Sequence, residues 1–250
     1  MTDRIETKPY GWRGRFGYVN PSIWDTTAYE FLKILPEGVM VTVYSLGVQR
    51  LTEDHFQRAR SRLVEAVEAL IGEEAQAVCI GGLLPMLREN NETPAVIDDL
   101  RRRNGIPIQQ TSRIVENAFR KLGVGKIGIV TPYRDATNAQ VKTSFDNKGF
   151  EVVHIQGLGI ERNVDLTRVS PEQMYRLALE VAAKAPEAEA LYFPCSRLAV
   201  ASLIAPLEKE TGRSVVTNVQ AVTWWALNAI GVDPCSTGFG KLLTLREPQS

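Results

Sequence analysis

The feature that most constrains the fold of this chain is a regular alternation of strand-like and helix-like segments along almost its whole length. Several strand-like segments are short continuous runs rich in Val and Ile, as in residues 126–131 (KIGIVT) and 214–217 (SVVT). Runs of this kind are typical of parallel strands that are buried on both faces of a sheet. The pattern predicts strands at 15–20, 39–45, 76–81, 107–110, 126–131, 150–156, 188–194 and 214–217. It predicts helices between them at 26–35, 53–71, 93–103, 112–122, 135–148, 170–184, 197–211 and 219–229.

The same order of strands and helices occurs twice, with a seam near residues 112–125. Gly123 is a typical helix stop just before the second half begins at Lys126. Each half has about 100 residues, which is enough for a doubly wound sheet of its own. We therefore expect an α/β protein with two similar parallel-sheet lobes related by pseudo-twofold symmetry and an active site in the cleft between them. Because the last helix is expected to pack back on the first lobe, the predicted domains are 1–113 plus 222–250 and 114–221.

Composition excludes several classes of function. The chain has 29 Lys and Arg residues against 29 Asp and Glu residues, so it lacks the broad basic field typical of nucleic-acid binding. No apolar run approaches the roughly 20 residues that span a bilayer, and the polar N-terminal segment lacks the apolar core of a secretory signal. Cys79, Cys195 and Cys235 form neither a disulfide framework nor a close-spaced metal set. We expect no nucleic-acid partner, no membrane association, no metal and a cytoplasmic location. The oligomeric state stays open, and a homo-oligomer is one of the alternatives.

Cys195 is the residue with the clearest potential for chemistry. It follows the predicted strand 188–194 and precedes a predicted helix. Ligands of open α/β sheets bind beyond the carboxyl ends of the strands, and a helix N-terminus there favours the thiolate form of a cysteine. The backbone N–H of Ser196 is expected to point at the same ligand, although Ser196 also suits a helix cap. The alternative for Cys195 is a small buried apolar residue, which is the commoner fate of a free cysteine.

Three other segments fall at predicted strand ends. Ser22, Thr26 and Thr27 offer hydroxyl groups for a carboxylate beside free backbone N–H groups, although Asp25 in the same loop also suits an ordinary helix cap. Gly82 follows a strand and permits close approach of the backbone to a ligand. Tyr133 offers a phenol at the end of the strand 126–131.

Together these segments resemble the aspartate/glutamate racemase superfamily, in the branch that holds the maleate cis-trans isomerases and the arylmalonate decarboxylases. The resemblance covers nearly the whole chain. It is carried by NPS…DTT, AVCIGGLLP, LGVGKIGIVTPYRDATN and ALYFPCSRLAVASLIAPLEKETGRSVVTNVQAVTWWALNAIG. It implies two lobes around a cleft, no cofactor, and a small carboxylate or dicarboxylate substrate.

The resemblance also implies roles for individual residues. Racemases and isomerases of the superfamily place one cysteine on each lobe, whereas arylmalonate decarboxylases keep only the second-lobe cysteine and have glycine at the first-lobe position. The second-lobe cysteine corresponds to Cys195, and the first-lobe position corresponds to Gly82. Cys79 then lies three residues earlier, inside a strand; if the register slips, Cys79 becomes the second thiol.

The chain departs from the decarboxylase pattern at Leu83 and Leu84, where the decarboxylases carry hydroxyl residues that help to hold a carboxylate. Leucines offer only their backbone N–H groups, so carboxylate binding is expected to depend on the backbone, on the first loop and on Tyr133, which matches the family's site tyrosine. Arg134 and Arg197 each suit either a charge partner for an acidic substrate or a solvent-facing position.

These residues predict a cofactor-independent, cysteine-dependent enzyme that acts at the carbon next to a carboxylate. The preferred reaction is decarboxylation of a malonate-type acid through an enediolate, which Cys195 protonates. One alternative is maleate cis-trans isomerisation or a racemisation of the aspartate/glutamate type that uses two cysteines. Another is a small-molecule binding module without catalysis, because two α/β lobes alone do not assign a function.

Overall fold

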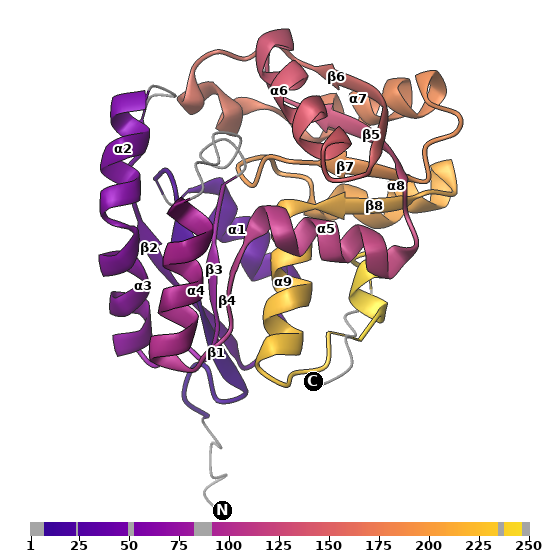
Figure 1. The fold of residues 1–250 in the computed structure, drawn as a ribbon. Coiled ribbons are helices and arrows are strands. Elements are labelled where there is room, and N and C mark those ends of the chain that lie inside the picture. The colour runs from indigo at the N-terminus through magenta and orange to yellow at the C-terminus, as the bar shows by residue number, and fades with distance from the viewer. Residues whose placement is uncertain (1–7, 24, 50–52, 83–91, 235–237, 247–250) are drawn as a thin grey trace, which may run out of the picture.

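The computed structural model describes residues 8–23, 25–49, 53–82, 92–234 and 238–246. Two four-stranded parallel sheets form its framework (Figure 1), with strand orders β2-β1-β3-β4 and β6-β5-β7-β8. The first sheet consists of β1 (Gly14–Asn20), β2 (Val39–Ser45), β3 (Val78–Ile80) and β4 (Ile108–Gln110). The second consists of β5 (Lys126–Thr131), β6 (Glu151–Gly157), β7 (Ala190–Phe193) and β8 (Ser214–Thr217). The two similar α/β lobes and all eight predicted strands are thus confirmed.

The helices connect the strands in the expected alternation. The α-helices are α1 (Thr26–Ile34), α2 (Glu53–Ser61), α3 (Leu63–Gly72), α4 (Glu92–Asn104), α5 (Thr111–Leu122), α6 (Asp135–Asp146), α7 (Pro171–Lys184), α8 (Ile204–Thr211) and α9 (Asn218–Ala229). Short 3-10 helices are η2 (Asn163–Arg168), η3 (Ala201–Leu203) and η4 (Lys241–Thr244).

Burial explains why continuous apolar runs predicted the strands. In β5 every residue after Lys126 is buried, and β7 is buried throughout, because each of these strands has a neighbour on both sides and helices over its faces. In the edge strand β2 all seven residues are only half-buried. The inner strands of each sheet therefore have the two-sided burial that parallel sheets require.

Two helix predictions differ from the structure. The predicted helix 53–71 is split at Arg62. The backbone angles of Arg62, a φ of −96° and a ψ of 0°, are not those of an α-helix. Its N–H donates to the carbonyl of Ala59, three residues earlier, instead of to a carbonyl four residues earlier. The predicted helix 197–211 begins as an α-helix only at Ile204, after a turn and the short η3. Cys195 therefore does not lie at a helix N-terminus, in contrast to our expectation.

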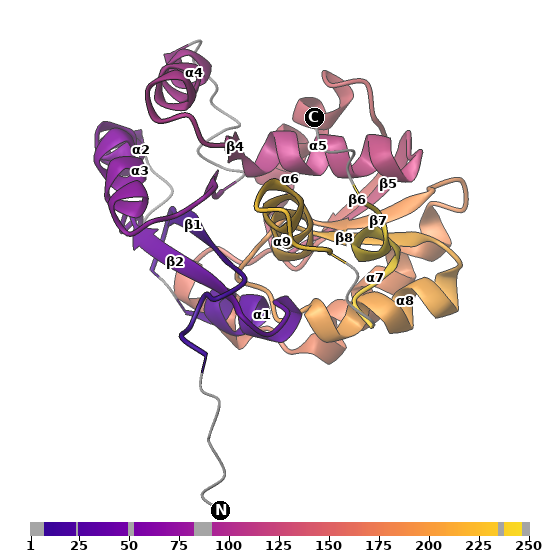
Figure 2. The ribbon, with the colours of Figure 1, turned by 90° about the horizontal axis from the view of Figure 1, so that it is seen from below.

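The two lobes share one packed core. Phe16 and Phe31 from the first lobe belong to the same buried apolar cluster as Phe119 and Tyr192. Helices α5 and α9 lie side by side between the sheets (Figure 2). Because α9 contacts α1 and β3 as well as α5 and β8, it belongs to the junction of the lobes, and the domain limits 1–113 plus 222–250 and 114–221 stay a prediction.

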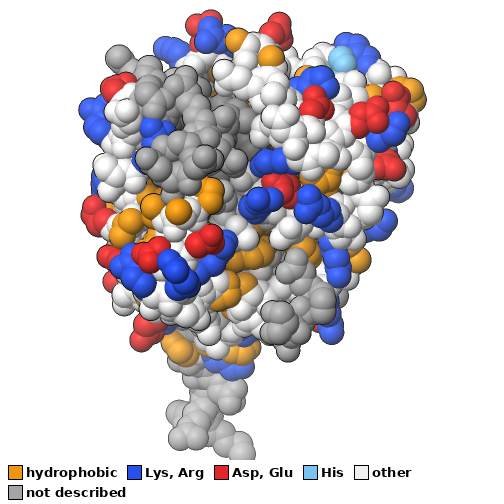
Figure 3. All heavy atoms as spheres, in the orientation of Figure 1, with side chains coloured by type: hydrophobic (Ala, Val, Ile, Leu, Met, Phe, Trp, Pro, Cys, Tyr) orange, Lys and Arg blue, Asp and Glu red, His pale blue; other side chains and the backbone are white. Residues whose placement is uncertain are grey.

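The surface carries both signs of charge. On the face drawn in Figure 3, Lys and Arg side chains alternate with Asp and Glu side chains. Among the residues that the structure describes, every helix is too short or too polar to cross a lipid bilayer.

Candidate functional site

Cys195 lies just beyond a central strand of the second sheet. It is the second residue after β7, and its side chain is 6% exposed. The N–H of Leu198 donates to the carbonyl of Cys195 at 3.3 Å and closes the turn. The backbone N–H of Arg197 and the hydroxyl of Tyr133 lie near the sulfur, and each lowers the pKa of the thiol. A single thiol at a strand end thus has two donors beside it.

The protonation of this thiol follows from its burial. Burial raises the pKa of Cys195, and the hydrogen bonds from Arg197 and Tyr133, together with the nearby guanidinium charge, offset only part of that rise. The expectation that a helix N-terminus favours a thiolate is wrong for this structure, because α8 begins nine residues further on. Cys195 is therefore a neutral thiol near pH 7, with donors placed to stabilise its sulfur once the proton has left.

Tyr133 lies two residues beyond β5, as predicted. Its N–H donates to the hydroxyl oxygen of Thr131 at 3.1 Å, and that hydroxyl donates to Asn138 at 2.7 Å. These bonds fix the strand end and aim the phenol at Cys195. The side chain is 8% exposed, and both burial and the neighbouring Cys195 raise the pKa of Tyr133, so the phenol keeps its proton.

The first lobe reaches the turn that carries Cys195 through the start of α1. Ser22 is buried, and its carbonyl accepts from the Asn20 amide at 3.1 Å. Thr26 opens α1 and is half-buried. Its neighbour Thr27 is fully buried and donates to the carbonyl of Ser196 at 3.1 Å. Sequence reasoning named both Thr26 and Thr27 as candidates for a carboxylate, and Thr27 instead makes the contact between the lobes.

Asp25 stands at the N-cap position of α1, but its side chain makes no capping hydrogen bond. Its carboxylate forms an ion pair with the guanidinium of Arg197, which also donates to the carbonyl of Asn163 at 2.6 Å. The Arg197 side chain is 11% exposed, so the solvent-facing alternative is wrong for this residue. Arg134, by contrast, forms an exposed surface pair with Glu161.

A buried carboxylate completes this contact. Glu30 is 1% exposed and accepts from the backbone N–H groups of Val200 and Ala201 at 2.8 and 2.6 Å. No local pattern in the sequence indicates this role for Glu30. We call Asp25, Thr27 and Glu30 the α1 clamp, because they hold the chain just after Cys195 from the opposite lobe.

The first-lobe counterpart of the thiol position is a glycine. Gly82 is the second residue after β3 and has a φ of +100°. Cys79 lies inside β3 and is fully buried, with its sulfur 3.5 Å from the hydroxyl of Thr111; burial raises the pKa of Cys79 to about 12. Leu83 and Leu84 lie outside the described residues.

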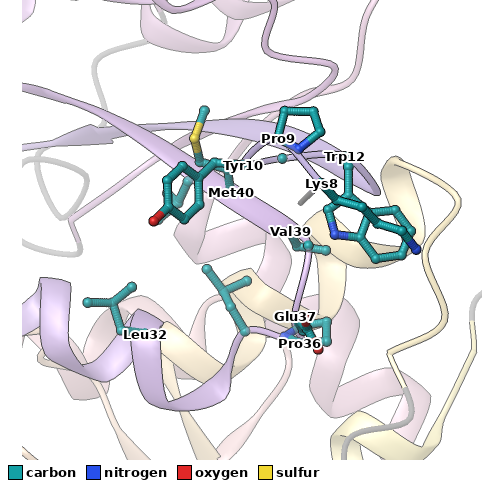
Figure 4. Close-up of a pocket in the computed structure, with 13 residues that line it drawn as sticks. Lys8, Pro9, Tyr10, Trp12, Leu32, Pro36, Glu37, Val39 and Met40 are labelled. Carbon is teal, nitrogen blue, oxygen red and sulfur yellow. The ribbon is translucent and has the colours of Figure 1, made fainter. Parts of the chain in front are cut away.

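Two other features of the described ranges are the lack of a metal-binding cluster and a pocket away from Cys195. These ranges contain no group of three or more His, Cys, Asp or Glu side chains that could hold a metal ion. A pocket of about 640 Å³ lies at the outer edge of the first lobe (Figure 4), where Tyr10, Leu32 and Val39 contribute to its walls. It contains none of the predicted site residues.

Comparisons with known proteins identify the family and the fold. The family model described as arylmalonate decarboxylase matches residues 17–243. The arylmalonate decarboxylase of Bordetella bronchiseptica is 24% identical over 199 residues, which cover 79% of this chain and 83% of that protein. Maleate isomerase from Pseudomonas putida S16 has a similar fold, with a TM-score of 0.83 at 20% identity over 92% of this chain and 98% of that one. A maleate cis-trans isomerase variant from Nocardia farcinica, solved with a covalently bound succinylcysteine intermediate, has a TM-score of 0.79 at 18% identity with the same coverages.

Proposed function

The chain belongs to the arylmalonate decarboxylase family, a family of enzymes, and on this premise we propose that it is a cofactor-independent decarboxylase in which Cys195 delivers a proton to the carbon next to a carboxylate. The observation that carries the proposal is the neutral thiol of Cys195, which has two hydrogen-bond donors at its sulfur. The family consists of enzymes, which argues against the alternative of a non-catalytic binding module.

The proposed reaction has two steps. A malonate-type substrate loses one carboxylate as carbon dioxide, and the electron pair of the broken carbon–carbon bond forms an enediolate on the remaining carboxylate. The S–H bond of Cys195 then breaks, its proton bonds to the α-carbon, and a thiolate remains. The hydroxyl of Tyr133 and the N–H of Arg197 stabilise that thiolate until water returns a proton.

The enediolate needs donors that are in place before the reaction. We assign this role to the hydroxyls of Ser22 and Thr26 and to backbone N–H groups at Gly82, Leu83, Leu84 and Ser196. Removal of one donor of this kind typically raises the activation barrier by about 3 kcal/mol. Because Asp25 already neutralises the charge of Arg197, substrate binding depends on neutral donors rather than on a free cation.

Maleate-type isomerisation is the second candidate, favoured by the succinylcysteine bound to the Nocardia isomerase variant. In that reaction a thiolate adds to the double bond, the central bond rotates and the adduct collapses. The neutral state of Cys195 favours proton donation over this addition. A racemase with two cysteines has less support, because the Cys79 sulfur lies inside β3 against Thr111.

One assay separates these reactions. Proton NMR in deuterium oxide, with substituted malonates, maleate and amino-acid enantiomers as the panel, reports the product of each. We expect loss of carbon dioxide from a malonate and a single deuterium at the new α-carbon. Conversion of maleate to its trans isomer, with no turnover of malonates, would contradict decarboxylation and support the second candidate.

A further inference from the structure

Arg197 joins two distant parts of the chain to the turn that carries the thiol. Its guanidinium pairs with the carboxylate of Asp25, and its Nε donates to Asp25 Oδ1 at 3.3 Å. A second nitrogen of the same guanidinium donates to the carbonyl of Asn163 at 2.6 Å. The Arg197 side chain is largely buried, so both contacts are shielded from water. The rigid fork of N–H groups that distinguishes arginine from lysine thus holds two partners at once.

The contact with Asp25 reaches the first-lobe loop between β1 and α1. Asp25 lies between Ser22 and Thr26, whose hydroxyls we assign to substrate binding. Its side chain makes no capping hydrogen bond to α1 and pairs instead with Arg197. The two paired residues are 172 positions apart in the chain, so this ion pair fixes the first-lobe loop to the second lobe.

The contact with Asn163 reaches the loop that carries Tyr133. Asn163 opens η2 in the segment after β6. Just before it, the N–H of Ile160 donates to the carbonyl of Pro132 at 2.8 Å. A Cβ atom at Gly157 would overlap the carbonyl oxygen of Tyr133, so the end of β6 lies directly against the same loop. The guanidinium therefore holds a segment that is itself bonded to the loop of the site tyrosine.

The third partner is the turn that bears Arg197 itself. Arg197 is the second residue after Cys195, and the N–H of Leu198 closes the turn on the carbonyl of Cys195 at 3.3 Å. A side chain whose far end is fixed on two sides restrains the backbone from which it starts. The loops that carry Cys195, Tyr133 and the first-lobe hydroxyls consequently meet at one guanidinium. We call these contacts of Arg197 with Asp25 and Asn163 the Arg197 bridge.

We propose that Arg197 is a positioning residue that sets the distance between the Cys195 thiol and the first-lobe donors by joining the three loops of the site. This inference rests on the proposed function, in which that thiol protonates the substrate. Arg197 acts through the Arg197 bridge and not by binding the substrate, since Asp25 already balances its charge. Small errors in the placement of a reacting group lower catalytic rates steeply.

Arg197→Lys is the first test, because it keeps the positive charge but replaces the fork by a single ammonium group. This variant loses the two-sided geometry of the Arg197 bridge. With an active substrate we expect kcat to fall about tenfold or more, while KM changes by less than about threefold. A merely structural role would lower the melting temperature without separating kcat from KM. An unchanged kcat, or a change in KM alone, would overturn the proposal.

Asp25→Asn is the second variant, and it decides the question if Arg197→Lys does not fold. It removes the charged partner and leaves the Asn163 carbonyl in place. We expect kcat to fall about fivefold, and the double variant to lose little more than Arg197→Lys alone, because both changes break the same contact. Losses that multiply in the double variant would contradict a shared role.

Arg176→Lys is the matched control. Arg176 forms an exposed ion pair with Glu172 on α7, and neither residue belongs to the site. This variant should keep the kcat and KM of the wild type, since exposed pairs contribute little. A loss of kcat as large as that of Arg197→Lys would show that the effect does not depend on the Arg197 bridge.

A measurement without turnover separates this inference from the proposed function. Iodoacetamide should alkylate Cys195 about threefold or more faster in Arg197→Lys than in wild type, the effect of losing one hydrogen bond at the turn. Peptide mass spectrometry locates the label, and Cys79, buried in β3, reports general loosening of the fold. If wild type turns over no substrate of the panel, the proposed function fails, whereas alkylation still decides whether Arg197 holds the turn. An unchanged rate at Cys195, or an equal increase at Cys79, would overturn the inference.

Discussion

The ends of β3 and β7 occupy equivalent places in the two sheets, but a glycine follows one strand and a cysteine follows the other. Strand β3 is the third strand counted from the edge strand β2, and β7 is the third counted from the edge strand β6. Two residues beyond β3 the chain has Gly82, and two residues beyond β7 it has Cys195. The other described cysteine, Cys79, lies inside β3 against Thr111, whereas Cys195 meets hydrogen-bond donors of the site. On the proposed function, the position of a cysteine relative to the strand end separates the packed Cys79 from the reactive Cys195.

The largest effect is expected for Cys195→Ala, which tests whether the thiol at the end of β7 is required for turnover. We expect kcat/KM to fall by about 1000-fold or more, because the proton donor is lost, while the circular dichroism spectrum stays that of the wild type. The matched variant Cys79→Ala should retain activity within about threefold, since a structural cysteine packs and does not react. Full activity of Cys195→Ala would rule out the proposed mechanism, and equal losses in both variants would point to a pair of catalytic cysteines.

The α1 clamp provides the next test, because it holds only the turn after β7. Glu30→Gln replaces one acceptor oxygen by a donor opposite the N–H groups of Val200 and Ala201. Urea unfolding should show a loss of about 1–3 kcal/mol, the usual cost of leaving a buried polar group unpaired. The control Glu172→Gln breaks an exposed pair with Arg176 and should cost less than about 0.5 kcal/mol. Equal stabilities of the two variants would show that the clamp contributes nothing.

Gly82→Ala tests the backbone conformation at the end of β3. A side chain at a φ of +100° is strained, so we expect the free energy of unfolding to fall by about 1–3 kcal/mol. Gly72→Ala is the control, because Gly72 has no positive φ and a Cβ there meets open space. Thermal melts of both variants measure the difference, and an unchanged melting temperature for Gly82→Ala would contradict the strain.

The smallest effect concerns alkaline stability. Cys79 keeps its proton in the folded state up to a pKa of about 12, whereas an unfolded cysteine loses it near about 8.5. The stabilisation is therefore complete below about pH 8.5 and is lost as pH rises towards 12, by up to about 1.4 kcal/mol per pH unit. Urea unfolding between pH 8 and 10 should show a shallower loss for Cys79→Ala than for wild type. Parallel curves would show that Cys79 does not hold its proton more tightly in the folded state.

Most of the fold was predictable because its signals are local. Strands β2 and β5 have the predicted ends, and for β5 the reason is that a parallel strand buried on two faces has a continuous apolar sequence. Helix α7 has a local start signal of this kind, because Ser170 forms a capping box and Pro171 follows in the first turn. The break at Arg62 left no comparable mark in the sequence.

The site was predictable only in part, because its contacts join residues far apart in the chain. Cys195 and Tyr133 stand at strand ends, which a pattern can locate. The turn after Cys195, however, is held by Thr27 and Glu30, so a helix prediction based on its own residues begins too early.

These long connections have a consequence for the order in which the protein forms. The second sheet is built from a continuous stretch of chain, residues 126–217, so it can assemble from contacts within one lobe. The hydrogen bond from Thr27 to Ser196 spans 169 residues and requires both lobes. The turn that carries Cys195 can therefore reach its described geometry only after the two lobes have docked.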